Sequence, residues 1–156
     1  MAQAASPVRR ARVLPPTYLL FAVVAMAALH LLAPWRHLIG LPWSLVGLVP
    51  LAIGVVLNLV ADSDLEKHGT TVKPFEPSSA LVTSGAYRVC RHPMYLGFTL
   101  ILLGLATLMG TVTPFAVLPA FVALIETTFV RAEERTMEAT FGDAWRAYKL
   151  RVGRWI

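Results

Sequence analysis

Two charged clusters at the ends of apolar segments have the residue types needed to bind a small molecule. The first is residues 91–97, which read Arg-His-Pro-Met-Tyr-Leu-Gly and begin an apolar segment; the second is residues 131–135, which read Arg-Ala-Glu-Glu-Arg and follow the next one. Arg91 offers a planar fork of donors for a carboxylate or phosphate, and His92 offers a donor that titrates near neutral pH. Pro93 suits the first turn of a helix, where free N–H groups and the helix dipole favour an anion.

Three carboxylates lie toward the end of the fourth apolar segment, at Glu126, Glu133 and Glu134. Glu126 and Glu133 are seven residues apart, so in a helix they share one face and lie roughly 10 Å apart along the axis. An ionisable residue inside a span is a functional candidate, although a structural salt bridge from Glu126 to Arg91, Arg131 or Arg135 is an equally simple explanation. If the two segments form a hairpin, cations and carboxylates meet at one end, which suits an amino-acid-like cofactor with both an ammonium and a carboxylate.

The elements that must position these clusters are membrane spans. Of the 156 residues, 56% are hydrophobic and only 15% are charged, which is more apolar than a soluble domain requires. Apolar runs cover about residues 17–33, 41–61, 94–109 and 112–130, and each approaches the ~20 residues that cross a bilayer. Little more than Gly110 and Thr111 separates the last two. We therefore expect an all-α integral-membrane bundle of about four spans, with a tight hairpin of spans three and four, forming one domain over residues 1–156.

The cations are distributed unequally between the two ends of these spans. Only Arg36 lies on one side, whereas the other side carries Arg9, Arg10, Arg12, Lys67, Lys73, Arg88, Arg91, Arg131, Arg135, Arg146, Lys149, Arg151 and Arg154. Because cytoplasmic loops retain Lys and Arg, this predicts a cytosolic N-terminal tail (1–16), a cytosolic connector (62–93) and a cytosolic tail (131–156). Contact with anionic membrane lipids accounts for the net charge of +5, and no nucleic-acid motif is present.

The connector and the C-terminal tail differ in pattern. The connector is rich in turn residues, which predicts a loop with room for one short helical piece. The tail repeats Phe141, Trp145, Tyr148, Val152 and Trp155 at helical spacing. This pattern predicts an interfacial helix whose aromatic stripe lies in the headgroup layer, and a stacking platform for a ligand is the less common alternative.

Several candidate residues also have a structural explanation. An isolated Arg91 would extend toward lipid headgroups. Tyr95 could anchor the helix at the interface or reach a ligand hydroxyl. Gly97 could pack helices together or let a flat ligand lie against the backbone. For Arg91, the neighbouring charged groups favour the functional interpretation, and for Tyr95 and Gly97 both interpretations stay open.

The sequence offers little support for a metal site or for redox chemistry. Asp62, Asp64 and His68 match no metal-site spacing, so we expect a loop and no metal site there. The single cysteine, Cys90, excludes an intrachain disulfide; small-residue packing is its expected role, and a reactive thiol beside Arg91 stays open.

The polar segments, taken together, resemble the isoprenylcysteine carboxyl methyltransferase and phospholipid N-methyltransferase superfamily. The resemblance covers roughly residues 58–156. It rests on residues 69–72 (Gly-Thr-Thr-Val), Pro74, Leu81, Val82, Ser84, Gly85, Tyr87, Arg88, the run 91–97, Glu133, Glu134, Phe141, Gly142 and Tyr148.

This resemblance implies an integral-membrane enzyme that binds S-adenosylmethionine in a cytosolic site capped by the connector and tail. By matching positions, the cofactor site would comprise Arg91, His92, Pro93, Tyr95, Gly97, Glu133 and Glu134, with Tyr87, Phe141 and Tyr148 lining or closing it.

Methyl transfer from a sulfonium is an in-line displacement, so a dry site that aligns the reactants does most of the work. A carboxylate acceptor needs orientation, by Arg91 or Arg131, whereas an amine or thiol must lose a proton to His92 or a glutamate. Arg91, His92 and Glu133 are therefore the catalytic candidates. The acceptor would be a lipid or lipophilic small molecule; a prenylated protein C-terminus, an ethanolamine lipid and a lipophilic thiol or acid all stay open.

Two other classes of protein also fit the pattern. One is a non-catalytic membrane scaffold or sensor that binds the cofactor without turnover. The other is a small transporter or respiratory accessory protein, with Glu126 as an ion site and His30 and His37 as haem ligands. His30 as a packed residue and His37 as an interface residue are the commoner interpretations.

Overall fold

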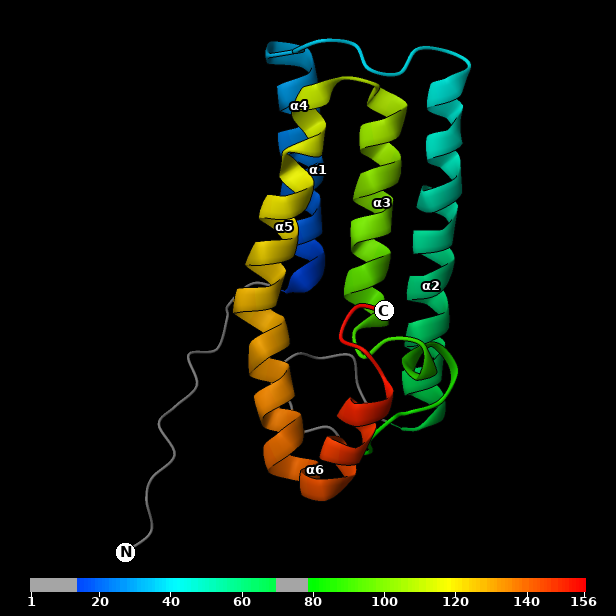
Figure 1. Cartoon of the computed structure of the whole chain (residues 1–156), viewed down its shortest axis with the longest axis vertical. Helices are drawn as coiled ribbons and strands as arrows, with labels where there is room; N and C mark the ends of the chain where they lie inside the picture. The colour runs from blue at the N-terminus through cyan, green and yellow to red at the C-terminus, as the bar shows by residue number, and fades with distance from the viewer. Residues whose placement is uncertain (1–13, 70–78) are drawn as a thin grey trace, which may run out of the picture.

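The protein is a bundle of helices in the residues that the computed structural model describes, 14–69 and 79–156 (Figure 1). Helix α1 spans Pro15–Leu32, α2 spans Leu48–Lys67 and α3 spans Pro93–Met109. A last long helix comprises α4 (Val112–Phe115), α5 (Val117–Ile125), a π-helical segment (Glu126–Val130) and α6 (Arg131–Arg151). Two short 3₁₀ helices, Trp43–Gly47 and Gly85–Arg88, precede α2 and α3.

Three helical stretches are long and apolar enough to cross a membrane, namely Pro15–Leu32, Trp43–Lys67 and Val112–Arg151, and α3 is a shorter apolar helix beside them. The predicted all-α membrane bundle is therefore confirmed. The structure does not describe residues 1–13 and 70–78, so the predicted N-terminal tail and part of the connector lie outside the described residues.

Helix α2 extends farther than the apolar run that predicts it. It continues to Lys67, so Asp62 and Asp64 lie on a helix and not in the loop we expected there. The polar end of α2 contacts the connector through Asp64, which is buried and whose Oδ2 accepts the Ala86 N–H at 2.9 Å. The short helix Gly85–Arg88 is the one helical piece predicted for the connector.

Helices α2 and α3 pack against each other through glycines. A Cβ on Gly54 would lie 2.5 Å from the carbonyl oxygen of Gly97, and one on Gly47 would lie 2.5 Å from that of Gly104. The two pairs are seven residues apart in both segments, with Gly47 at the end of the 3₁₀ helix that leads into α2, so the backbones approach along one stripe. Helix packing is thus the observed role of Gly97.

The predicted hairpin of spans three and four is also present. Gly110 ends α3 with a φ of 69°, and α4 begins two residues later at Val112. Below this turn, α1, α3 and α5 share a core that includes Met26, Leu102 and Ile125. The hairpin brings the start of α3 and the start of α6 to the same end of the bundle (Figure 1).

The C-terminal tail reverses direction, which the sequence pattern does not predict. Helix α6 continues the last span directly, then turns sharply at Gly142, whose φ of 50° and ψ of −117° are non-helical. Beyond it, residues 143–156, here called the return segment, run back toward the start of α3 (Figure 1). The tail therefore does not begin as a separate helix in the headgroup layer.

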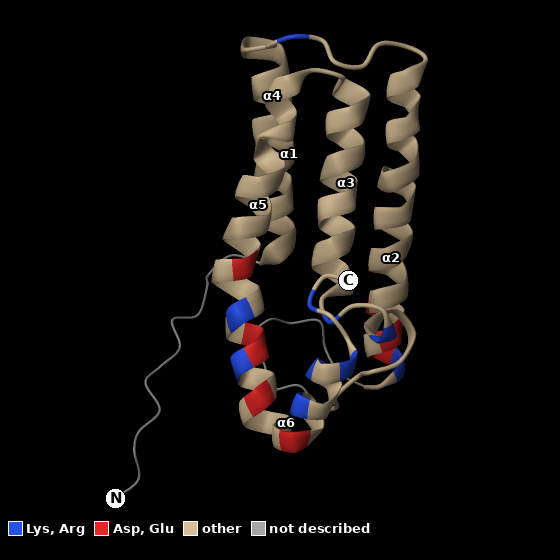
Figure 2. Ribbon diagram, viewed as in Figure 1, with Lys and Arg blue, Asp and Glu red and all other residues tan. Residues whose placement is uncertain are grey.

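Charged residues concentrate at the end of the bundle where α2 ends and α3 begins, here called the charged end (Figure 2). The apolar parts of the four spans carry almost none, and the loop at the opposite end holds Arg36 (Figure 2).

Candidate functional site

The two charged clusters meet at the charged end. Nη2 of Arg91 lies 3.0 Å from Oε1 of Glu134, and both side chains are only 9% exposed. Arg91 comes from the residues just before α3, and Glu134 from the first turn of α6. The hairpin between the two helices therefore brings cation and carboxylate together.

His92 lies between the twin glutamates. Its Nδ1 is 3.5 Å from Oε2 of Glu133, and its Nε2 is 3.5 Å from Oε1 of Glu134. Burial alone would lower the pKa of this imidazole, but the hydrogen bonds and negative charges of the two glutamates outweigh it and raise the pKa above its ordinary value. The site therefore favours a protonated His92.

Tyr95 holds Glu133 from the membrane side of the cluster. Its hydroxyl donates to Oε1 of Glu133 at 2.5 Å, and its ring stacks on His92 with centroids 5.8 Å apart. In the described part of the chain, no lysine or arginine forms an ion pair with Glu133, whose side chain is 24% exposed. Of the two neighbouring glutamates, Glu133 is thus the one whose described contacts, His92 and Tyr95, include no arginine.

Arg154 completes the cluster, and sequence reasoning missed it as a site residue. Its Nε and Nη2 donate to the two oxygens of Glu134 at 3.1 and 2.6 Å, and its Nη1 donates to Oε1 of Glu126 at 3.2 Å. Arg131 also reaches Glu126, at 3.4 Å. The salt-bridge explanation of Glu126 is therefore the observed one, with Arg154 as an additional partner. Hereafter the charged cluster means Arg91, His92, Glu133, Glu134 and Arg154.

Arg91 also binds the backbone of the return segment. Its Nη1 donates to the carbonyl oxygens of Lys149 and Val152 at 3.3 and 3.2 Å, and its backbone N–H donates to that of Gly153 at 3.0 Å. The guanidinium carbon lies 6.0 Å from the centre of the Trp145 ring. Arg91 therefore points into the protein and not toward lipid headgroups.

The aromatic stripe of the tail packs inside the protein, which corrects the expected membrane anchor. Trp145 and Tyr148 are 3% and 2% exposed, and Leu81, Met137 and Phe141 pack against them. The Tyr148 hydroxyl donates to the carbonyl oxygen of Tyr87 at 2.5 Å. A buried helix and an interfacial helix share the same three-to-four spacing, so the pattern alone could not distinguish them.

Among the described residues, two buried nitrogens in and beside the cluster have no hydrogen-bond partner, Nε of Arg91 and Nε1 of Trp145, and Nε2 of His92 has only its 3.5 Å contact with Glu134. Buried polar atoms are nearly always hydrogen-bonded, so such a group of unpartnered atoms calls for an explanation. A ligand that presents acceptor atoms would supply it.

The remaining predicted site residues lie as follows. Pro93 is buried at the first position of α3. Tyr87 lies in the short helix before α3, where burial and then the charge of Glu133 raise the pKa of its phenol. Phe141 lies just before the reversal and is partly buried. Gly97 is not brought to the cluster, because a Cβ on it would collide with the Asn58 amide of α2.

The features that suggested other functions have structural partners. His30 Nδ1 lies 2.8 Å from the Thr111 hydroxyl, as expected of a packed residue. Cys90 is buried, as expected of a packing role. Among the described residues, no group of three His, Cys, Asp or Glu side chains is arranged to hold a metal ion.

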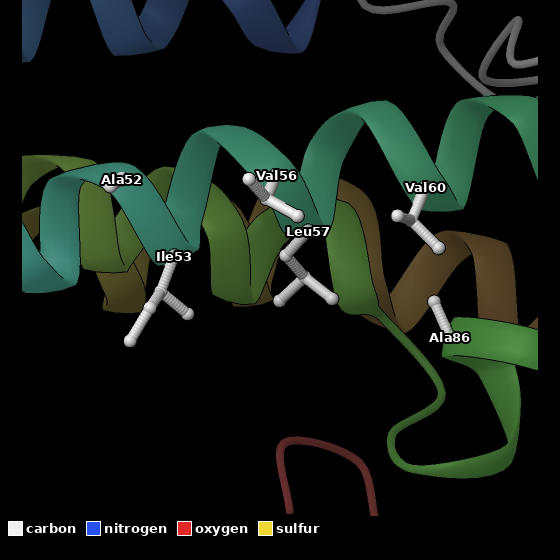
Figure 3. A pocket seen from close by; sticks show the side chains of 6 residues that line it. All are labelled: Ala52, Ile53, Val56, Leu57, Val60 and Ala86. Atoms are coloured by element: carbon white, nitrogen blue, oxygen red, sulfur yellow. The ribbon is translucent and has the colours of Figure 1, made fainter.

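An apolar hollow lies on the outer face of α2 near the charged end (Figure 3). It is an open surface hollow of about 400 Å³, and all the residues that line it are apolar. The lining side chains are those of Ala52, Ile53, Val56, Leu57, Val60 and Ala86. Since Ala86 belongs to the short helix that leads to Arg91, the hollow ends beside the segment that carries the cluster.

Comparison with curated proteins finds relatives that match part of the chain. The cobalt-zinc-cadmium resistance protein CzcN of Cupriavidus metallidurans is 38% identical over 66 residues, which are 42% of this chain and 31% of that protein. The nickel-cobalt-cadmium resistance protein NccN of Alcaligenes xylosoxydans xylosoxydans is 33% identical over 66 residues, with the same shares. The match thus spans about a third of the length of these two relatives.

An uncharacterized protein of Haemophilus influenzae is 35% identical over 63 residues, which are 40% of this chain and 100% of that protein. No solved structure gives a significant match. The sequence pattern of the phospholipid methyltransferase family matches residues 43–144, from the start of the second span to just beyond the Gly142 reversal. This match includes Arg91, His92, Glu133 and Glu134, and the chain therefore belongs to the phospholipid methyltransferase family of membrane methyltransferases.

Proposed function

We propose that the protein transfers a methyl group from S-adenosylmethionine to a lipophilic acceptor at the charged end of the bundle. One observation carries the proposal: in a chain of a methyltransferase family, Glu133 has no arginine or lysine partner among the described residues and lies in a cluster with the buried, unpartnered Nε of Arg91 and, beside it, Nε1 of Trp145. The site thus offers a carboxylate for a cation and donors for an anion within one cluster.

The residues present fit this cofactor. Its amino-acid part carries an ammonium, which suits Glu133, and a carboxylate, which suits the unpartnered Nε of Arg91 and Nε1 of Trp145. When bound, the cofactor supplies a methyl group on a positively charged sulfur. The negative charge of Glu133 would then lie close to the positively charged groups of the cofactor.

The chain's own residues would bind, orient and desolvate the reactants. The packed return segment and the start of α3 exclude water from the cluster, since Arg91 and His92 are almost fully buried. A carboxylate acceptor needs only orientation, which Arg91 or protonated His92 would provide. An amine or thiol acceptor must lose a proton, and Glu133 is the base at hand.

The hollow on α2 supports a lipophilic acceptor. All its lining side chains are apolar, so a hydrocarbon chain could lie there without desolvating a polar group (Figure 3). The concentration of Lys and Arg at the charged end supports a cytosolic position for the cluster. The acceptor would then approach within the bilayer and the cofactor from the cytosol.

A label-transfer experiment tests the proposal. Purified protein is incubated with a native lipid extract and methyl-labelled S-adenosylmethionine, and the labelled product is identified. We expect label in an organic-soluble product, whose chemistry as an ester, a methylated amine or a thioether defines the acceptor. Glu133→Gln should lose both binding and transfer, whereas Glu66→Gln, which neutralises an exposed carboxylate at the same end, should retain both.

The outcomes separate the function classes. Cofactor binding without transfer to any lipid would support the sensor or scaffold alternative. Absence of binding by the folded wild-type protein would refute the proposal.

A further inference from the structure

Arg154, in the return segment, uses its whole guanidinium group in hydrogen bonds to carboxylates. Each of its three guanidinium nitrogens donates to a carboxylate oxygen, two on Glu134 and one on Glu126. These carboxylates belong to α6 and to the π-helical segment, 20 and 28 residues earlier in the chain. Arg154 therefore joins the C-terminal end of the protein to the helix that carries both glutamates of the site.

The contacts of Arg154 leave Glu134 no free oxygen. Oε1 of Glu134 has Arg91 at 3.0 Å and Arg154 at 3.1 Å, and Oε2 has Arg154 at 2.6 Å. A ligand ammonium would have to displace an arginine to reach this carboxylate. Glu134 thus serves to hold cations in place, and Glu133 remains the carboxylate for a ligand.

The same contacts fasten the end of the chain across the start of α3. Gly153, next to Arg154, accepts the backbone N–H of Arg91, and Trp155 on the other side packs against the main core. Arg151, three residues earlier at the end of α6, is exposed, and within the described part of the chain it reaches only the Ala147 carbonyl oxygen of its own helix. Two arginines near the end of the chain therefore have different surroundings.

We propose that Arg154 is a positioning residue of the cofactor site, acting through Glu134 and Arg91 while it fastens residues 152–156 over the cluster. Glu134 orients Arg91 and lies against His92, so a carboxylate that is held from both sides fixes both donors at once. The inference rests on the proposed function and assigns a role to a residue outside the two charged clusters of the sequence.

Cofactor affinity in matched variants tests the positioning role. We expect Arg154→Gln to weaken binding of labelled S-adenosylmethionine to the purified protein by about tenfold or more, since a charge-assisted pair is lost. Arg154→Lys, which keeps the charge but cannot contact both oxygens at once, should recover part of the affinity. Arg151→Gln, with the same loss of charge in the same segment, should bind as the wild type does. Thermal unfolding in detergent confirms that each variant is folded. If Arg154→Gln does not fold, the affinity of Arg154→Lys is compared with that of the wild type instead.

Mobility of the chain end gives a second measurement that needs no cofactor. Ile156 is 92% exposed, so a spin label on Ile156→Cys in a Cys90→Ser background reports on the end without occupying the site. We expect a restrained label with Arg154 present and a mobile one in Arg154→Gln. Unchanged affinity or unchanged mobility in Arg154→Gln would overturn the inference. If the wild type binds no cofactor, the proposed function fails, and mobility alone decides whether Arg154 fastens the end.

Discussion

Glu133 and Glu134 are neighbours in the sequence, yet their partners differ in kind. Both lie 3.5 Å from His92, but Glu134 is also bonded by two arginines, whereas the further partner of Glu133 among the described residues is the neutral hydroxyl of Tyr95. Removing the charge of Glu134 would leave two guanidinium groups without their main counter-ion in a largely buried place. Removing that of Glu133 would leave a side-chain oxygen that still accepts from Tyr95.

We therefore predict that Glu134→Gln destabilises the fold more than Glu133→Gln. Breaking one partner of a buried ion pair costs about 3 kcal/mol, whereas a changed hydrogen bond costs about 1 kcal/mol. Thermal unfolding of the two variants in the same detergent measures the difference. Equal stability of the two would contradict the separate roles given to the glutamates.

His92 should make stability depend on pH. Its pKa in the folded protein is raised above the ordinary value of about 6.5 because Glu133 and Glu134 favour the imidazolium. The fold thus binds the proton more tightly than the unfolded chain does. The resulting stabilisation is complete below the ordinary pKa and is lost as pH rises through the raised one.

We predict that the wild-type melting temperature decreases more steeply than that of His92→Gln as the pH rises from about 6 to about 9. Parallel melting curves for the two proteins across the range would show that His92 does not titrate as proposed.

The residues that the sequence could predict are those whose partner lies at a helix end. Arg91 lies just before the first helix of the hairpin, and Glu134 follows its second helix. Because the turn between the two helices is short, hydropathy and loop length alone predict their contact. Arg154 carries no such signal, because its contact with Glu134 depends on a reversal at Gly142 that no span pattern contains. Tyr95 could be placed near the cluster, but its bond to Glu133 required the three-dimensional structure.

At the scale of elements, Gly142 decides where the return segment goes. Its φ of 50° and ψ of −117° lie in a region that residues with a Cβ avoid, although a Cβ there would meet no other atom within 4 Å. A substitution would therefore cost backbone strain and no steric clash. The return segment brings Trp145 and Arg154 to the cluster, so strain at this turn should affect the site.

We predict that Gly142→Ala destabilises docking of the return segment by about 1 to 3 kcal/mol and weakens cofactor binding. Limited proteolysis of the C-terminal end measures the docking. Gly40→Ala is the matched control, because a Cβ on Gly40 also meets nothing within 4 Å and its φ is not positive. Wild-type resistance to protease in Gly142→Ala would mean that the turn tolerates a side chain.

Hydropathy predicts where helices cross the membrane more reliably than where they end. The spans were located well because length and apolar content suffice, but α2 continues through Asp62 and Asp64 to Lys67. The buried bond from Ala86 to Asp64 that stabilises this extension is a contact between distant segments. The spacing of residues along the sequence does not predict such a contact. For the same reason, the spacing of Trp145 and Tyr148 predicted an interfacial stripe although both side chains are buried.

For the whole molecule, the strongest asymmetry is electrostatic. Nearly all described lysines and arginines lie at the charged end, together with the cluster, while Arg36 lies at the other end (Figure 2). A membrane protein is oriented largely by this difference, so we predict that the basic end lies in the cytosol. A cofactor made in the cytosol would then reach the cluster without crossing the bilayer.

Cysteine labelling in intact cells tests this orientation. In a Cys90→Ser background, a cysteine at Gly40 has open space around it, and one at Asp143 replaces a side chain that is 97% exposed. We predict that a membrane-impermeant maleimide labels Gly40→Cys in intact cells and labels Asp143→Cys only after permeabilisation. The background protein without an added cysteine is the control for unspecific reaction. The reverse labelling pattern would place the charged cluster outside the cytosol, where it could not receive S-adenosylmethionine, and would therefore contradict the proposed function as well as the orientation.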